Sequence, residues 1–290
     1  GKTNVRMNRS QARKPIKIAP TTSAGRAALA VSATVLALAG SGVAYAGNCY
    51  VSALNTVSCN GDFTDTIINF IPTDDLTLVL GDSAPTSVTP GIGDPGLVAI
   101  WENVTVVSYA DITTVAADGI FADGYTASVT NHGSITTDAT LNEYANAIDV
   151  NAFYDATVVN DGNILVYSNY GEGAVTAVSA YSFAGIATID NQEGGDIQAS
   201  AYSGDAYGVY ALAVFGDASV NNSGSIAASS FGGNATAITA TSIFGDASVT
   251  SAGHTEAYSL DGNTTGIYAS SLAGTASIDN SGEIQTGSVY

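Results

Sequence analysis

The chain has 290 residues, enough for one or two domains, and combines a hydrophobic content of 46% with a charged content of only 11%. All seven Lys and Arg residues lie within the first 26 positions and all 26 Asp and Glu residues lie after position 46, so segment 47–290 has a formal charge of −26. Phosphate groups need cationic partners, which excludes nucleic-acid binding by this segment. Docking to anionic lipid through a basic patch is excluded for the same reason.

The N-terminal segment has the three parts of a secretory signal peptide. Its basic residues precede an uninterrupted apolar run from Ala27 to Leu38, and the small-x-small sequence Ala44-Tyr45-Ala46 follows. The apolar run is too short for a transmembrane helix, which needs roughly 20 residues. We therefore expect a signal peptide over residues 1–46, cleaved after Ala46, and export through the inner membrane. The mature chain would reach the cell surface, the outer membrane or the extracellular space.

Segment 47–98 contains the two cysteines of the chain, Cys49 and Cys59, and lacks the repeat that follows it. In an oxidising compartment an isolated pair predicts a disulfide. Two thiols without a nearby His make an incomplete metal site. We expect this segment to form an N-terminal cap of strands over the first repeat, which would otherwise present an open edge.

Residues 99–290 carry the repeat Ala-x-Val/Ile-x-Asn-x-Gly-x-Ile, as in the segment from Ala127 to Ile135. Its Val/Ile positions recur every 29 to 31 residues: Val129, Val158, Ile189, Val220, Val249 and Ile278. Within each copy these residues alternate with Ser, Thr or Asp, and this period of two is typical of strands with one buried side. Helical repeats are excluded because no stripe with a period of 3.6 residues occurs.

The repeat predicts an all-β fold, a right-handed parallel β-helix (β-solenoid) of about seven rungs. The Val/Ile positions would form its core column, and the repeated asparagines would form a hydrogen-bonded ladder at one corner. The ladder residues are Asn131, Asn160, Asn191, Asn222 and Asn280. A β-propeller is the alternative, but its blades repeat at ~40–50 residues and the chain has no repeated Trp motif.

The repeat, together with segments such as Gly266-Ile267-Tyr268-Ala269 between its copies, resembles the passenger domains of bacterial autotransporters. The long basic leader and the N-terminal cysteine pair agree with this resemblance, which covers residues 100–290 and the leader. It implies a Gram-negative outer-membrane protein whose C-terminal β-barrel lies outside this sequence. The partners that it implies are a host-cell surface, a glycan or other bacterial cells. Because the sequence begins before Met7 and stops at Tyr290 inside a repeat, we expect a truncated part of a longer protein.

Candidate catalytic motifs are incomplete. Gly81-Asp82-Ser83 resembles a block of a lipase/esterase family, but that chemistry needs an Asp-x-x-His pair. Val129 and Ser251 stand three residues before the only histidines, His132 and His254. Polysaccharide lyases, which share the β-helix fold, use Lys or Arg near the scissile bond, and segment 47–290 has neither. We therefore predict no catalytic or cofactor-binding residues.

Asp217 and Asp246 form a further candidate pair because both precede an Ala-x-Val strand of the repeat. In register they would stack about 5 Å apart, near the separation of a retaining glycosidase. The same pair could hold Ca²⁺. The simpler interpretation is two solvated turn aspartates.

These observations favour a surface-exposed or secreted autotransporter passenger with a structural or adhesive role and no catalysis. The alternatives are a secreted glycan hydrolase that uses Asp217 and Asp246, and a surface spacer without adhesive function.

Overall fold

The computed structural model describes residues 48–53, 55–68, 75–139, 145–170 and 173–288. All regular elements of these residues are β-strands. The described residues all belong to one compact unit. The predicted signal peptide and its cleavage site lie outside the described residues. Within the described ranges, no helix is long and apolar enough to cross a membrane.

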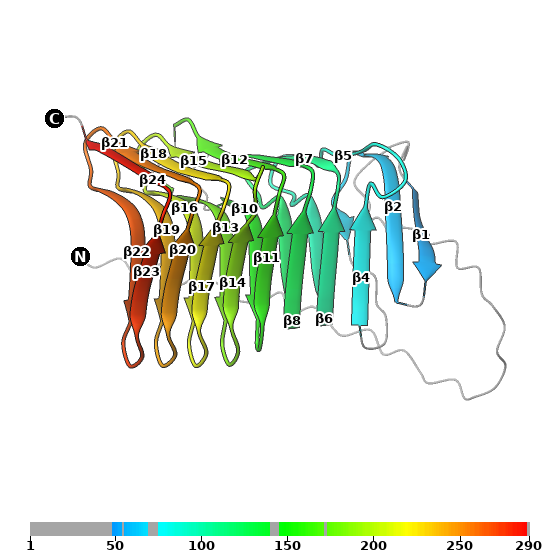
Figure 1. Ribbon diagram of the computed structural model, residues 1–290. Coiled ribbons are helices and arrows are strands. Elements are labelled where there is room, and N and C mark those ends of the chain that lie inside the picture. Colours follow the sequence, from blue (N-terminus) through cyan, green and yellow to red (C-terminus); the bar gives the residue numbers. More distant parts are fainter. Residues whose placement is uncertain (1–47, 54, 69–74, 140–144, 171–172, 289–290) are drawn as a thin grey trace, which may run out of the picture. The chain divides into compact units, whose positions relative to one another are not determined.

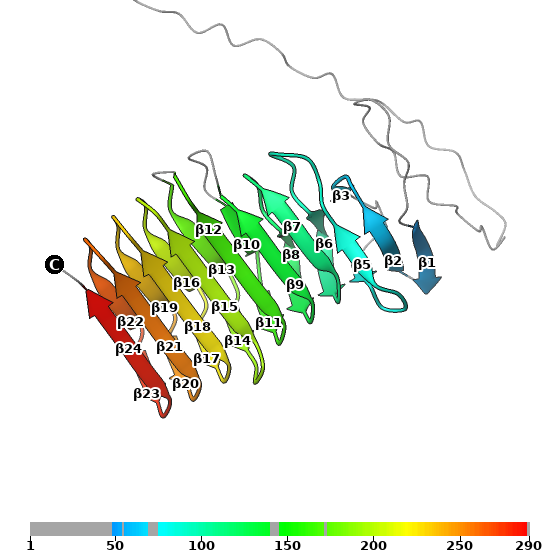
Figure 2. The same ribbon diagram turned by 90° about the horizontal axis from the view of Figure 1, so that it is seen from above.

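The prediction of a parallel β-solenoid is confirmed. From residue 145 onward each turn contributes three strands, which pair in parallel with the equivalent strands of the neighbouring turns (Figures 1 and 2). The chain winds in a right-handed sense, rising along the front row of strands in Figure 1 and returning behind it. We name the three rows of strands faces 1, 2 and 3 in chain order, and we name each corner by the two faces that it joins.

The faces consist of short strands of similar length in every turn. Face 1 contains β10 (Ala145–Ala152), β13 (Val175–Ser182), β16 (Ala206–Ala213), β19 (Ala235–Ser242) and β22 (Thr264–Ser271). Face 2 contains β11 (Ala156–Asn160), β14 (Ala187–Asn191), β17 (Ala218–Asn222), β20 (Ala247–Ser251) and β23 (Ala276–Asn280). Face 3 contains β7 (Asp111–Val115), β9 (Ser134–Asp138), β12 (Asn163–Ser168), β15 (Asp196–Ala201), β18 (Ser225–Ser230), β21 (His254–Ser259) and β24 (Glu283–Ser288).

The N-terminal strands are less regular. The long strands β6 (Leu97–Ser108) and β8 (Ile120–Asn131) each run through faces 1 and 2. Before them lie β1 (Asn48–Ala53), β2 (Thr56–Phe63), β3 (Ile67–Ile68), β4 (Asp75–Leu80) and β5 (Thr86–Val88).

Strand alternation places the core inside the solenoid. In β11 the buried positions are Ala156, Val158 and Asn160, and the residues between them are partly exposed. The predicted core column is in register, with Val158 paired to both Val129 and Ile189. These residues and Val220 are fully buried, because the turns above and below cover them. Ile278 shares the column but is 50% exposed on the last described turn.

The parallel stack continues into the segment predicted as a cap. Val57 of β2 pairs with Leu78 of β4, which pairs with Val106 of β6 in the same core column. Strand β1 is antiparallel to β2, and its Cys49 lies directly opposite Cys59. The two cysteines form the predicted disulfide. The first strand pair is thus joined covalently to the parallel stack.

Candidate binding surface

The predicted asparagine ladder lies at the 2–3 corner. Each side-chain amide donates to the side-chain oxygen one turn further on, from Asn131 to Asn160, Asn191 and Asn222, and each of these N···O distances is 2.9 Å. The four side chains are at most 1% exposed. The same amides donate to backbone carbonyls in the following bend, such as that of Gly162 at 3.0 Å. These four asparagines therefore satisfy buried polar groups and offer no exposed group to a ligand.

The ladder changes at its C-terminal end. Ser251 replaces asparagine and accepts the Asn222 amide at 3.3 Å. Asn280, on the last described turn, is exposed and donates to the carbonyl of Gly282 at 2.9 Å.

Asp217 and Asp246 stack one turn apart at the 1–2 corner and are both exposed. Oδ1 of Asp217 accepts the backbone N–H of Asp246 at 2.8 Å. Oδ1 of Asp246 accepts the backbone N–H of Thr275 at 2.7 Å in the same way. Each carboxylate thus holds the bend of the next turn, which is a structural role. Within the described parts of the chain, no group of three or more His, Cys, Asp or Glu side chains could hold a metal ion.

The Gly81-Asp82-Ser83 segment also has structural contacts. Asp82 accepts hydrogen bonds from the side chains of Ser58 at 3.3 Å and Asn60 at 3.0 Å. The backbone N–H of Ser83 donates to the Asn60 side chain at 3.3 Å. His132, the nearer histidine in sequence, pairs instead with Asp161 at 2.7 Å.

A recurring bend forms the 1–2 corner, with the sequence Ser-x-x-Gly. Ser242 donates from Oγ to the carbonyl of Gly216 in the previous turn at 2.8 Å, and it accepts the N–H of Gly245 at 2.9 Å. The glycine is required because a Cβ at Gly245 would lie 2.2 Å from the carbonyl oxygen of Gly216. Ser271 and Gly274 make the same bend one turn later. The two residues between Ser and Gly therefore project outward.

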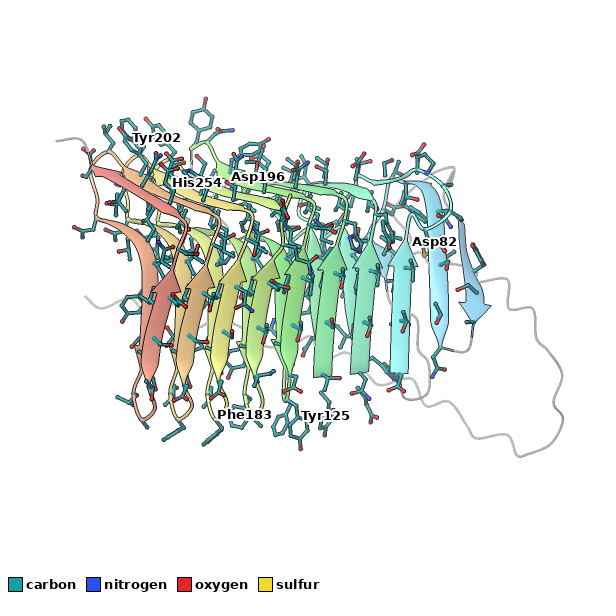
Figure 3. The ribbon with its side chains drawn as sticks, viewed as in Figure 1. Asp82, Tyr125, Phe183, Asp196, Tyr202 and His254 are labelled. Carbon is teal, nitrogen blue, oxygen red and sulfur yellow. A yellow bond between two sulfur atoms is a disulfide. The ribbon has the colours of Figure 1, made fainter. Side chains whose placement is uncertain are left out.

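At this corner the projecting residues are apolar or aromatic on six successive turns. We call this surface the apolar ridge. It consists of Tyr125, Phe153, Tyr154, Phe183, Ala184, Val214, Phe215, Ile243, Phe244, Leu272 and Ala273. Figure 3 labels Tyr125 and Phe183 at the lower end of the faces, where the ridge lies. The aromatic side chains of the ridge are 39% to 55% exposed, and Leu272 is 81% exposed.

The rings of the ridge contact one another from turn to turn. The ring centroids of Tyr125 and Phe153 are 5.8 Å apart. Those of Phe153 and Phe183 are 5.4 Å apart, and those of Phe183 and Phe215 are 5.2 Å apart. Phe215 and Phe244 are stacked at 5.0 Å. Such pairs stabilise the fold by about 0.5–1.5 kcal/mol each. They also form a continuous exposed apolar surface, which on soluble proteins marks interaction sites.

An acidic cluster lies at the N-terminal end of face 1. Burial raises the pKa of Asp118 to about 6; the N–H of Asn146 opposes the shift and the charge of Asp149 adds to it. Burial also raises the pKa of Asp149, against hydrogen bonds from Asn151 and Ser179. The tyrosines Tyr210 and Tyr268 lie further along the same face, on outward positions. Tyr268 is 48% exposed, whereas Tyr210 is half-buried.

Sequence reasoning identified the Asp217/Asp246 column but missed the ridge beside it. The signal was the pair of apolar residues before each Gly, as in Val214-Phe215-Gly216 and Ile243-Phe244-Gly245. These residues interrupt the strand alternation, so the period-two pattern does not include them.

No known protein family matches the sequence, and no curated protein or solved structure matches the chain.

Proposed function

We propose that the chain is the exported passenger part of an autotransporter, displayed at the cell surface or released, with a structural and adhesive role and no catalysis. The apolar ridge carries this proposal: six successive turns expose apolar side chains at one corner of a solenoid whose strands otherwise alternate regularly. A spacer needs only regular stacking, whereas a contact surface needs exposed apolar area. The basic leader and the lack of Lys and Arg after it support export and a partner that is not anionic.

Attachment of cells that display the chain tests the adhesive role. Replacing Phe183, Phe215 and Phe244 together by Ser should lower attachment at least tenfold while surface display is unchanged. Replacing the same three residues by Leu is the matched control, because it keeps an apolar ridge, and attachment should stay within about twofold. Equal attachment by both variants would identify the solenoid as a spacer. A wild-type chain that is not exported would contradict the passenger assignment itself.

The glycan-hydrolase alternative rests on the stacking of Asp217 and Asp246 one turn apart. Glycosidase chemistry needs both carboxylates. An Asp217→Asn variant would therefore lose all hydrolysis of a glycan panel if this pair were catalytic. We expect the wild-type chain and the variant to release the same background level of reducing ends. A wild-type signal that the variant abolishes would establish catalysis.

A further inference from the structure

The 3–1 corner repeats the bend of the 1–2 corner with a different outer surface. Ser230 Oγ donates to the carbonyl of Gly204 at 2.8 Å and accepts the N–H of Gly233 at 2.8 Å. Ser259 makes equivalent bonds to Gly233 and Gly262 one turn later. Again two residues project before each Gly, after Ser230, Ser259 or the equivalent Ala201, but here one column is apolar and the other is polar or small. The apolar column is Tyr202, Phe231 and Leu260, and the second column is Ser203, Gly232 and Asp261.

A polar groove of about 530 Å³ runs beside this second column. Its floor is bare backbone, formed by the stacked glycines Gly204, Gly233 and Gly262. A Cβ at Gly233 would lie 2.4 Å from the carbonyl oxygen of Gly204, and one at Gly262 would lie 2.1 Å from that of Gly233. Only glycine fits these positions, so the groove is a fixed consequence of how the turns stack. Its volume lies in the range of small-ligand sites, roughly 300–1,000 Å³.

The walls of the groove offer hydrogen-bonding groups of both kinds. Asp205 accepts the backbone N–H of Asn234 at 2.7 Å, and Asn234 accepts that of Asn263 at 2.9 Å, so these two residues fix the wall. In the described parts of the chain, the side chains of Ser203, Asp261 and Asn263 have no hydrogen-bond partner. Ser203 supplies a hydroxyl on one turn, and Asp261 and Asn263 supply a carboxylate and an amide two turns further along the groove.

Aromatic side chains project from the same corner, where Tyr202 and Phe231 directly precede the lining residues Ser203 and Gly232. Tyr202 and Phe231 stack with their centroids 5.2 Å apart, and Tyr170 lies 6.4 Å from Tyr202 on the preceding turn. Tyr170 is 86% exposed, which leaves most of its ring open. Figure 3 places Tyr202 at the upper end of the faces, opposite the ridge residues Tyr125 and Phe183. A second hollow of about 390 Å³ lies against Tyr202 and Phe231 and is lined by serines of face 3.

We propose that this groove binds an extended, uncharged polysaccharide that lies along the solenoid axis. Sugar hydroxyls can donate to Asp261 and exchange hydrogen bonds with Ser203 and Asn263, while the apolar face of a sugar ring packs on Tyr170. The free groups lie two turns apart, so a ligand that contacts all of them must extend along the solenoid axis. The formal charge of −26 on segment 47–290 disfavours uronic-acid or sulfated chains. This inference rests on the adhesive role proposed above and names the ligand class for it.

Gly232 allows the groove to be filled without disturbing the fold. A Cβ at Gly232 would meet no atom closer than 3.4 Å, and the residues in register with it, Ser203 and Asp261, carry side chains. A Gly232→Trp variant would thus place a large ring in the groove. Ser223→Trp is the matched control, because Ser223 is exposed at the 2–3 corner, away from the groove.

The test uses the 290-residue chain on an array of neutral glucans, mannans, galactans and arabinans, with polyuronates and heparin on the same slide. We expect binding to at least one neutral polymer, a loss of at least tenfold in affinity for Gly232→Trp, and a loss of about fivefold for Tyr170→Ala. Ser223→Trp should bind like the wild type. Circular dichroism and melting temperature confirm that each variant is folded.

Three results would overturn the proposal: no binding to any neutral polymer, preferential binding to the anionic polymers, or equal binding by Gly232→Trp and the wild type. If one of these occurs while the Ser variant of the apolar ridge still loses cell attachment, the groove assignment fails and the adhesive role stands. If cell attachment is independent of the ridge but Gly232→Trp loses glycan binding, the ridge argument fails and the groove assignment stands.

Discussion

Asn191 occupies the middle of the buried amide ladder, with one asparagine partner on each side at 2.9 Å. An Asn191→Ala substitution would leave the amide of Asn160 and the oxygen of Asn222 buried without that partner. Leaving buried polar groups unsatisfied costs about 1–3 kcal/mol. We expect the free energy of unfolding to fall by about 2–3 kcal/mol, measured by denaturant titration.

Two variants control for this effect. Ser251 accepts the Asn222 amide in the natural ladder, so Asn191→Ser should lose less stability than Asn191→Ala. Asn280→Ala, at the exposed end of the same column, should be nearly neutral. Equal losses at positions 191 and 280 would show that the ladder does not contribute through burial.

Asp118 makes stability depend on pH. Its pKa in the folded chain is raised to about 6 from an ordinary value of 3.8, so the folded state binds a proton more tightly than the unfolded state. The stability that the chain gains from protonated Asp118 is fully present below pH 3.8 and is lost as the pH rises through 6. Asp118→Asn should therefore stabilise the chain at pH 7 by roughly 1 kcal/mol, allowing for partial exposure. Melting temperatures of both chains across pH 4–7 measure this, and parallel curves would contradict it.

At the level of the bend, two neighbouring glycines have opposite roles. Gly233 forms the groove floor, where a Cβ would collide with the carbonyl of Gly204, whereas Gly232 faces open space. Gly233→Ala should force the turns apart and lower stability by about 2–4 kcal/mol, while Gly232→Ala should change it by less than about 0.5 kcal/mol. Thermal unfolding of the pair compares them directly. Equal melting temperatures would mean that the turns can separate at little cost.

The strands and their register followed from the sequence because the core requirement is local and repeated. Val129, Val158 and Ile189 had to face inward in every turn, and the asparagine beside each core position fixed the corner. The same logic did not reveal that β2 and β4 belong to the stack. In β2 and β4 the core column needs only an apolar side chain. Val57 and Leu78 supply it, although these strands lack the Asn-x-Gly of the repeat.

The candidate site was less predictable because it is built from bends. The ridge and the groove depend on Ser-x-x-Gly bends lying directly above one another, so that residues such as Phe215 and Phe244, about one repeat apart in sequence, form one surface. Alternation within a strand does not encode that stacking. The sequence showed the Gly-Asp pairs at 216–217 and 245–246 but not the hydrogen bonds that commit their carboxylates to the next turn.

For the solenoid as a whole, the dominant electrostatic property is self-repulsion, since segment 47–290 has a formal charge of −26 without compensating cations. Raising the ionic strength from about 0.1 M to about 1 M shortens the Debye length from about 10 Å to about 3 Å. We expect the melting temperature to rise by several degrees with sodium chloride over this range. An equal concentration of a neutral osmolyte serves as the control for excluded-volume effects. A melting temperature independent of salt would show that the carboxylates are too far apart to repel.

The backbone and asparagine hydrogen bonds join only adjacent turns, and this also determines how the solenoid responds to force. Because each turn bonds only to its neighbours, tension applied at the two ends breaks one interface at a time and does not load all interfaces together. Each rupture releases about 30 residues, or about 100 Å of extended chain. Stretching a single molecule should therefore give a sawtooth of near-equal steps, in which the chain lengthens under load while the remaining turns keep their structure.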